Sequence, residues 1–192
     1  IAIVQGAPTP VGYVRFRQSN EFYYLTGIEV AHAYVLIDGK TRTSTLYLPA
    51  QNSGRERSEG KILSTVDADF ITGQLGFEGA HDPAKLTEHL QDHVKRQPLP
   101  AVYTMFSPAE GLSVSRDLGR RRVSDIAADP WDGRPSREQH FIGLINERFP
   151  AIEVKDLPAI LDQLRLIKSE RELALIRKST LLSAYGLMEA MR

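Results

Sequence analysis

Short apolar segments with the length of β-strands alternate along this chain with longer segments that have the periodicity of amphipathic helices. Strands are predicted at residues 1–4, 33–37, 44–48, 101–103 and 152–154, with a weaker candidate at 13–16. Helices are predicted at residues 20–25, 83–97, 113–128, 136–149, 156–161 and 169–192. This alternation predicts an α/β domain in which helices flank a sheet.

One turn decides the type of sheet. Asp38-Gly39 stands between the strands at 33–37 and 44–48, and Asp-Gly favours the tight turn of a hairpin. At least one strand pair is then antiparallel, so we expect a mixed sheet. The polar segment 51–60 is predicted as an exposed loop or short helix. The glycines at 73, 76 and 79 lack the dinucleotide-binding pattern and are interpreted as a loop.

Composition narrows the possible partners. The 192 residues are 42% hydrophobic and 25% charged, which is typical of a soluble globular protein of one domain plus an appendage. Lys and Arg number 24, as do Asp and Glu, and this balance argues against a general nucleic-acid or anionic-membrane binder. Apolar runs reach only about five residues, too few to cross a membrane. We expect no nucleic-acid or membrane partner.

The chain has no cysteine, which excludes disulfides, cysteine-ligated zinc and a thiol nucleophile within these residues. His89 and His93 have the i, i+4 spacing of a helical metal pair. The protease motif His-Glu-x-x-His needs a glutamate directly after the first histidine, where this chain has Leu90. We therefore interpret both histidines as residues at the border of an amphipathic helix.

Three further motifs have ordinary structural explanations. The segment 111–115 lacks the second glycine of a nucleophile elbow and is predicted as a helix start capped by Ser113. Asp67 and Asp69 are interpreted as carboxylates at a helix start. The arginines at 120–122 are expected on a solvated helix face. From the residues alone, no catalytic set assembles.

The final segment has the pattern of a long helix. Ser169 with Glu172 forms a capping box, and apolar residues then repeat at spacings of three and four through to Met191. Because such a stripe needs burial, it packs either on this domain or on residues absent from the sequence. The chain starts with Ile1 rather than Met, so we interpret it as part of a longer protein. We expect swapped or paired packing of this helix, or poor order.

Two stretches resemble a known family. The first, 16–27, matches a Phe/Tyr-Arg-Gln motif that continues into Phe-aromatic-Tyr and Thr-Gly, carried here by Phe16, Arg17, Gln18, Phe22, Tyr23, Tyr24, Thr26 and Gly27. The second, 165–177, matches a domain-junction motif carried by Arg165, Lys168, Ser169 and Glu172. Together they resemble the N-terminal domain of Xaa-Pro aminopeptidases, in the creatinase/prolidase group of pita-bread metallopeptidases. The hairpin ending in Thr45–Pro49 falls between them.

The resemblance implies a ribonuclease H-like mixed sheet flanked by helices over residues 1–163. Residues 164–192 would be the linker and first helix of a catalytic domain whose remainder follows Arg192. That domain would hold two divalent metals, commonly manganese, on two Asp, one His and two Glu, and would hydrolyse the bond before proline. None of those catalytic or metal ligands is in this sequence. The implied substrates of the intact protein are proline-containing peptides.

In this family the domain is non-catalytic; it makes subunit contacts and narrows the entrance to an active site, which implies a homo-oligomer. We expect a cytoplasmic location. Many relatives carry Glu-x-Trp-x-Gly after the Leu-Pro strand, whereas this chain has Ser58 in place of the tryptophan, between Glu56 and Gly60. Trp131 lies in another loop and is interpreted as a partly buried anchor. Glu56, Ser58 and Trp131 are therefore candidate interface or entrance residues.

The aromatic motif is expected to be mainly structural. Phe22 and Tyr23 would pack the helix on the sheet, with Arg17 in an ion pair. Two other functions share the same domain pattern and stay open. One is a creatinase-like hydrolase with a small non-peptide substrate, and the other is a metal-free pita-bread protein that serves as a binding scaffold.

Overall fold

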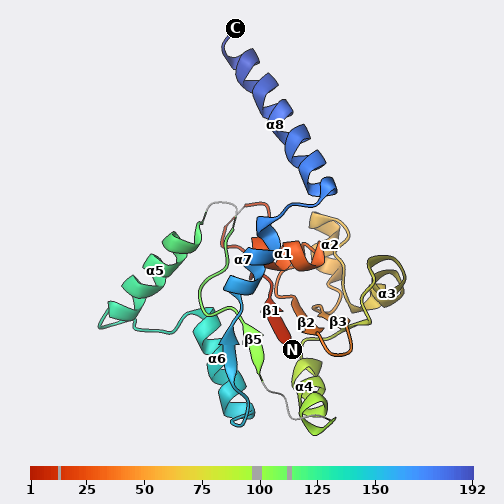
Figure 1. Ribbon diagram of the computed structural model, residues 1–192, viewed down its shortest axis with the longest axis vertical. Coiled ribbons are helices and arrows are strands. Elements are labelled where there is room, and N and C mark those ends of the chain that lie inside the picture. The colour runs from red at the N-terminus through yellow and green to blue at the C-terminus, as the bar shows by residue number, and fades with distance from the viewer. Residues whose placement is uncertain (13, 97–100, 112–113) are drawn as a thin grey trace. The chain divides into compact units, whose positions relative to one another are not determined.

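The computed structural model describes residues 1–12, 14–96, 101–111 and 114–192. Two compact units divide the chain, Ile1–Leu157 and Pro158–Arg192. The first contains β1 (Ala2–Gln5), α1 (Asn20–Thr26), β2 (Tyr34–Asp38), β3 (Thr43–Tyr47), α2 (Ser53–Glu59), the 3-10 helix η1 (Thr65–Asp67), α3 (Ala68–Leu75), β4 (Gly79–His81), α4 (Lys85–Arg96), β5 (Val102–Thr104), α5 (Arg116–Ala128), α6 (Arg137–Arg148) and β6 (Val154–Asp156) (Figure 1). The second contains α7 (Pro158–Leu166) and α8 (Glu170–Ala190).

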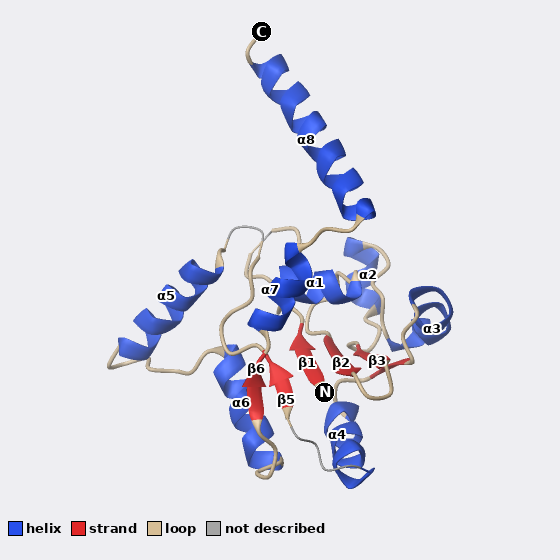
Figure 2. Ribbon diagram, viewed as in Figure 1, coloured by secondary structure: helices blue, strands red, loops and turns tan. Residues whose placement is uncertain are grey.

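The strands form one six-stranded sheet in the order β4-β3-β2-β1-β5-β6 (Figure 2). The first three strands in sequence are antiparallel neighbours, with Ile3 opposite Leu36 and Leu36 opposite Thr45. Strand β4 is parallel to β3, β5 is parallel to β1, and β6 is parallel to β5. The predicted mixed sheet flanked by helices is therefore confirmed.

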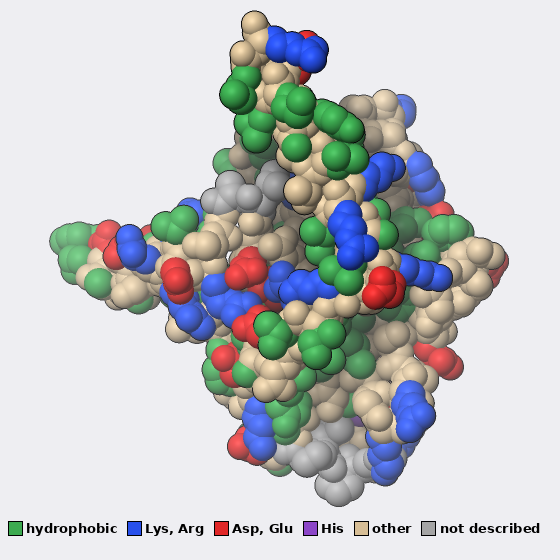
Figure 3. Space-filling model, turned by 45° about the horizontal axis from the view of Figure 1, so that its top comes forward, with side chains coloured by type: hydrophobic (Ala, Val, Ile, Leu, Met, Phe, Trp, Pro, Cys, Tyr) green, Lys and Arg blue, Asp and Glu red, His purple; other side chains and the backbone are tan. Residues whose placement is uncertain are grey.

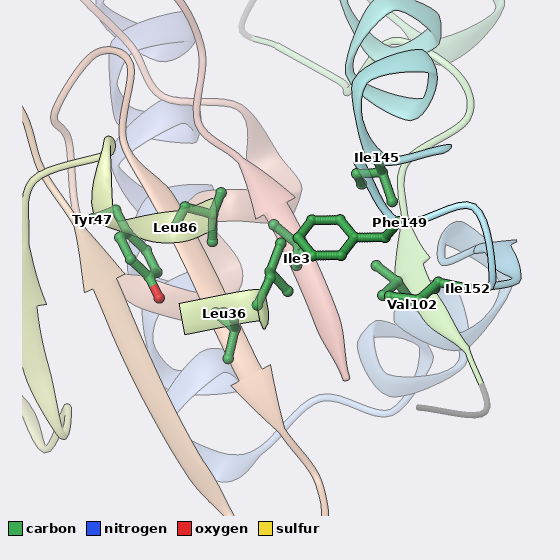
Figure 4. Close-up of a cluster of buried hydrophobic side chains, with 9 residues drawn as sticks. Ile3, Leu36, Tyr47, Leu86, Val102, Ile145, Phe149 and Ile152 are labelled. Carbon is green, nitrogen blue, oxygen red and sulfur yellow. The ribbon is translucent and has the colours of Figure 1, made fainter. Parts of the chain in front are cut away.

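Consecutive residues are buried along β1, β2 and β3, as expected for a sheet covered on both faces. One face packs against α4 and α6 in a cluster of Ile3, Leu36, Tyr47, Leu86, Leu90, Val102, Ile145, Phe149 and Ile152 (Figure 4). The strand neighbours Val4, Val35 and Leu46, which point to the opposite face, are also buried. Helix α1 contacts β1, and its Phe22 is completely buried.

Two local predictions were wrong. Residues 14–16 form no strand, and Tyr13 lies outside the described residues. The glycine-spaced segment is not a loop, because α3 contains Gly73 and ends at Gly76, whose φ of 76° is the left-handed conformation that glycine adopts readily. Gly79 then begins β4. The residues Gly-Ala-His of β4 have no apolar alternation, so only its pairing with β3 makes this segment a strand.

Helix α5 begins later than the sequence predicts. The hydroxyl of Ser115 accepts a hydrogen bond from the Leu118 amide at 3.3 Å, so Ser115 is the N-cap. The predicted cap Ser113 lies outside the described residues. Only Gly119 is buried along α5, and the helix therefore presents nearly all its side chains to solvent. The arginines at 120–122 are all exposed, as predicted for a solvated face.

In the second unit, the capping box of α8 is confirmed. The Ser169 hydroxyl accepts from the Glu172 amide at 3.3 Å, and the Glu172 carboxylate accepts from the Ser169 amide at 2.7 Å. Leu173 is half-buried, and the other large apolar side chains of α8 are 48–69% exposed: Leu175, Ile176, Leu181, Leu182, Tyr185, Leu187 and Met188. The predicted domain boundary at residues 163–164 falls inside α7. In the described parts of the chain, no helix combines the length and apolar character that a membrane crossing requires.

Candidate functional site

The first motif is organised around the buried side chain of Gln18. Its Oε1 atom accepts hydrogen bonds from the backbone amides of Ala7 and Ser19, and its Nε2 atom donates to the Val30 carbonyl at 2.9 Å. Gly6 leaves the space that this amide occupies, because a Cβ at Gly6 would lie 2.8 Å from Gln18 Nε2. Gln18 thus connects the segment before the motif, the N-cap of α1 and the segment that follows α1.

A buried ion pair holds the next segment to α1. The carboxylate of Glu21 is completely buried and lies 3.3 Å from Nη2 of Arg116, at the first residue of α5. The Glu110 amide donates to Glu21 Oε2 at 3.0 Å, and the Asn20 amide donates to the Glu110 carbonyl at 2.9 Å. These contacts hold the loop before α5 against the start of α1.

The end of α1 explains the Thr-Gly of the motif. The Thr26 hydroxyl donates to the Phe22 carbonyl at 2.8 Å and accepts from the Ile28 amide at 3.1 Å. Gly27 has a φ of 67° and its amide donates to the Tyr23 carbonyl at 2.7 Å, so it closes the helix in the left-handed conformation. Thr26 and Gly27 therefore stop α1 and turn the chain toward β2.

The aromatic residues of the motif divide between the core and the surface. Phe22 is completely buried, whereas Tyr23 is 50% exposed and Tyr24 is 40% exposed. Phe16 is half-buried. The expected ion pair of Arg17 is present, with Glu29 at 3.2 Å, although both side chains are largely exposed. The exposed part of α1 thus presents the rings of Tyr23 and Tyr24 for contact with another molecule.

A pocket of about 230 Å³ lies beside this motif. Its lining includes Phe16 and Glu29 from the motif side, His32 before β2, Arg55 and Glu59 from α2, and Ser64. The walls carry opposite charges that are already paired, since Arg55 Nε lies 2.8 Å from Glu59 Oε2. Such a surface can bind a side chain or a small ligand.

His32 lies at the rim of this pocket with an unusual backbone, a φ of 59°. Its Nε2 atom accepts a hydrogen bond from the Thr9 amide at 3.1 Å, which requires that nitrogen to be unprotonated. Partial burial, followed by the nearby guanidinium groups of Arg137 and Arg55, lowers the pKa of His32 below 6.5. The residue therefore stays neutral at neutral pH.

The candidate entrance residues Glu56 and Ser58 both lie on α2. The Glu56 carboxylate accepts from Gln51 Nε2 at 2.7 Å and from the Ile62 amide at 3.2 Å, and these bonds, with Lys61, lower its pKa. The Ser58 hydroxyl donates to the Arg55 carbonyl at 3.0 Å. Glu56 thus fixes the loops on both sides of α2, while Ser58 is exposed and bonded within its own helix.

Trp131 corrects one expectation. It is 97% exposed, so it does not anchor its loop by burial. The Asp129 carboxylate organises that turn instead, by accepting hydrogen bonds from the amides of Trp131 at 2.8 Å and Asp132 at 3.3 Å. An indole with this exposure is available for contact with a partner.

The junction residues form a short polar cap at the start of α8. Lys168 Nζ donates to the Leu166 carbonyl at 3.1 Å. The hydrogen bonds from the Ser169 hydroxyl and amide, with the Lys168 charge, lower the pKa of Glu172. Arg165 is in the last turn of α7. These residues shape the connection between two helices and hold no reacting group.

The structure separates the two histidines of the candidate metal pair. His89 hydrogen-bonds to Tyr47, whereas His93 lies 3.6 Å from Asp38. Asp67 accepts from Ser64 and pairs with Lys61 at 3.0 Å, so it serves the start of η1 as interpreted. Across residues 1–12, 14–96, 101–111 and 114–192, no three His, Asp or Glu side chains gather as a metal site would require.

Sequence reasoning missed the Glu21–Arg116 pair and the role of His32. In the sequence, Glu21 stands next to the aromatic residues of α1. A carboxylate is unusual on the face of a helix that packs into the core. Its partner lies 95 residues away, so nothing local identified the pair.

Basic and acidic side chains are interspersed over the face in Figure 3, in accord with the balanced composition.

Comparisons with known proteins agree with this arrangement. A family model described as aminopeptidase P, N-terminal domain, matches residues 1–103. The protein named "Probable Xaa-Pro aminopeptidase" from Pyricularia oryzae is 24% identical over 170 residues, which cover 82% of this chain and 30% of that protein.

Solved structures show the same fold. Aminopeptidase PepP from Pseudomonas aeruginosa superposes with a TM-score of 0.63 at 24% identity, over 99% of this chain and 39% of that chain. Proline aminopeptidase P II from Yersinia pestis gives a TM-score of 0.62 at 21% identity, over 99% and 40%. This sequence thus spans well under half the length of these proteins. Because the family model covers more than half of it, the chain belongs to the family of aminopeptidase P N-terminal domains.

Proposed function

We propose that this chain is the non-catalytic N-terminal domain of a metal-dependent Xaa-Pro aminopeptidase, which releases an N-terminal residue from the proline that follows it. The observation that carries the proposal is the family match over residues 1–103. The similarity over 170 residues to a protein named as an Xaa-Pro aminopeptidase supports the same activity for the intact protein.

The side chains of α8 support the proposal that residues 164–192 lead into a catalytic domain. No charged residue occurs from 179 to 188. Leu182 and Leu187 lie about 140° apart around the helix axis, so the apolar surface is wider than a single stripe. A helix that is apolar on several sides needs more than one neighbour to cover it. This favours a position inside a larger domain.

The metals of the proposed enzyme would be bound outside this sequence. The described residues offer no group of three His, Asp or Glu, so they do not fit a two-metal centre. In the proposed parent, two manganese ions are held by two Asp, one His and two Glu that follow Arg192. This chain contributes no step of the hydrolysis itself.

The proposed contributions of the chain are subunit assembly and control of access to the active site. Tyr23 and Tyr24 on α1, Trp131 in its loop and the pocket between the motif and α2 are surfaces suited to such contacts. Narrow access would favour free peptide ends over folded proteins. With Ser58 in place of a tryptophan, α2 offers no large aromatic ring for a peptide.

The test begins with the source gene. The reading frame is sequenced past Arg192, over about one further domain length, and the intact protein is expressed with manganese. We expect two Asp, one His and two Glu in that order, and release of the first residue from peptides with proline second. A matched peptide with alanine second is the control and should be cleaved far more slowly.

Other outcomes identify the alternatives. Intact ligands with no turnover of either peptide would contradict the peptidase proposal and favour a creatinase-like hydrolase. Replacement of the ligands would contradict the enzyme as a whole and favour a binding scaffold.

A further inference from the structure

Three aromatic side chains beneath α4 form a compact group: Tyr47 from β3, His81 from β4 and His89 from α4. The Tyr47 hydroxyl lies 2.8 Å from His89 Nδ1. The two imidazole centroids are 4.8 Å apart with their planes at 88°. The Tyr47 ring is 5.6 Å from His89 and 6.2 Å from His81. Each ring therefore neighbours both others, and we call this group the imidazole cluster.

The cluster joins the edge of the sheet to a core helix. Strand β4 is the edge strand, and the Leu48 amide donates to the His81 carbonyl at 2.8 Å. Gly79 leaves space for the imidazole, since a Cβ there would lie 2.9 Å from His81 Nε2. Figure 4 shows Tyr47 beside Leu86 of α4, at one end of the core cluster. The imidazole rings thus lie where α4 meets β3 and β4.

Burial favours the uncharged forms of these groups. It raises the pKa of Tyr47 well above its usual range, so Tyr47 faces His89 as a neutral phenol. Burial also lowers the pKa of His89, and the His81 charge, when present, lowers it further. A phenol can donate to neutral His89 or accept from its protonated form, so the first proton preserves the Tyr47 contact.

The charged neighbours of His89 on α4 act on its pKa in both directions. Glu88 and Asp92 favour its protonation and Lys85 opposes it. Glu88 is paired with Lys85 at 2.7 Å, and Asp92 with Lys95 at 3.5 Å. From strand β4, the His81 ring faces His89 with 4.8 Å between the ring centroids.

We propose that His81 and His89 act as one coupled proton-binding pair. When the pair carries one proton or none, α4 stays packed against the β3–β4 edge, and when it carries two, α4 is released from that edge. One charged imidazole can direct its edge at the face of a neutral ring, a favourable arrangement. Two charged rings at this spacing repel each other. Groups that interact this closely titrate as a pair, in two separated steps.

His93 on the same helix provides a built-in contrast. Its Nδ1 atom lies 3.6 Å from Asp38 Oδ2. Burial of Asp38 opposes its ionisation, but hydrogen bonds from Lys40 and Thr41 prevail and lower its pKa. Asp38 is therefore ionised when His93 gains a proton, so acid strengthens this contact. The variant His93→Gln removes a contact of opposite pH response one helical turn from the cluster.

The experiment is an NMR titration of the imidazole carbons in the 192-residue chain from pH 8 to pH 4.5. We expect the His81 and His89 curves to be broad and two-step, separated by about one pH unit or more. His81→Gln should raise the pKa of His89 and leave its titration curve with a single step. His140→Gln, an exposed change on α6, should move neither.

Hydrogen exchange reports the release of α4. After correction for intrinsic rates, the amides of Leu48 and Leu90 should lose protection at least tenfold more between pH 7 and pH 5 in the unmodified chain than in His81→Gln. His93→Gln should enlarge that loss. Independent single-step curves for His81 and His89 in the unmodified chain, or equal acid response in His81→Gln, overturn the proposal. If a variant does not fold, the two-step shape in the unmodified chain decides.

Discussion

The carboxylate of Glu21 on α1 lies 3.3 Å from the guanidinium of Arg116 on α5, and the Glu21 side chain has no exposure to solvent. This pair links residues 95 positions apart. It connects the motif at α1 to the exposed helix α5, whose only buried residue is Gly119. The charge pair therefore helps to place α5.

Removing one charge of this pair should be costly. Glu21→Gln removes the completely buried carboxylate that faces Arg116 and leaves the Glu110 carboxylate at 4.0 Å, so we expect a loss of about 3 kcal/mol in the free energy of unfolding. Glu59→Gln breaks the exposed pair with Arg55 on α2 and should cost less than about 1 kcal/mol. Urea unfolding of both variants compares them. Equal losses would show that the buried pair has no special weight.

The space at Gly6 should tolerate no side chain. Gly6→Ala places a Cβ 2.8 Å from Gln18 Nε2 and 3.1 Å from the Ala33 carbonyl, so we expect a loss of about 1–3 kcal/mol. Gly143→Ala is the matched control, because it lies within α6 with open space around it and should stabilise the helix by about 0.5–1 kcal/mol. Thermal unfolding should move the two midpoints in opposite directions.

Trp131 should be dispensable for folding. Because it is 97% exposed, Trp131→Ala should change the free energy of unfolding by less than about 0.5 kcal/mol. Phe22, in the same motif as Tyr23 and Tyr24, is completely buried. Phe22→Ala should therefore lower the free energy of unfolding by about 3–5 kcal/mol. A large loss in Trp131→Ala, measured by denaturant unfolding, would falsify the description of this loop.

Acid should weaken the contact between His32 and Thr9. The folded-state pKa of His32 lies below 6.5, so the unfolded chain binds more protons and this contribution to stability falls as pH drops below 6.5. His32→Asn cannot titrate, and asparagine tolerates the φ of 59°. The difference in unfolding midpoint between the two proteins should shrink from pH 7.5 to pH 5. A constant difference across that range contradicts the sign derived from the pKa.

Local signals in the sequence were enough for much of the fold. The capping box at Ser169 and the helix stop at Gly27 depend on neighbouring residues, and both appear where expected. The hairpin at Asp38-Gly39 also forms, but through the longer loop 39–42, because Asp38 itself pairs with Thr43. Strand β4 was not predictable, because its pairing with β3 is its only stabilising feature. The exposure of Trp131 likewise depends on the packing around it, which its local sequence does not encode.

For the candidate site, the sequence identified several of the important residues but not the residues that they contact. Gln18 was identified through the motif, but its bonds to Ala7 and Val30 require the complete fold. His89 was identified by its spacing from His93. Its actual partners, Tyr47 and His81, come from two strands, so a pattern within one helix could not reveal them.

The central position of β1 has a consequence for folding during synthesis. Strand β1 pairs with β2 on one side and with β5 on the other, and the Tyr103 amide donates to the Ile1 carbonyl at 2.9 Å. Until the ribosome has made residues 102–104, only the strands β1, β2, β3 and β4 can pair, with one side of β1 open. Closing a loop of this length makes folding slow. A nascent chain that ends before residue 102 therefore exposes the unpaired edge of β1. Chaperones that bind extended segments should associate with the chain at that stage.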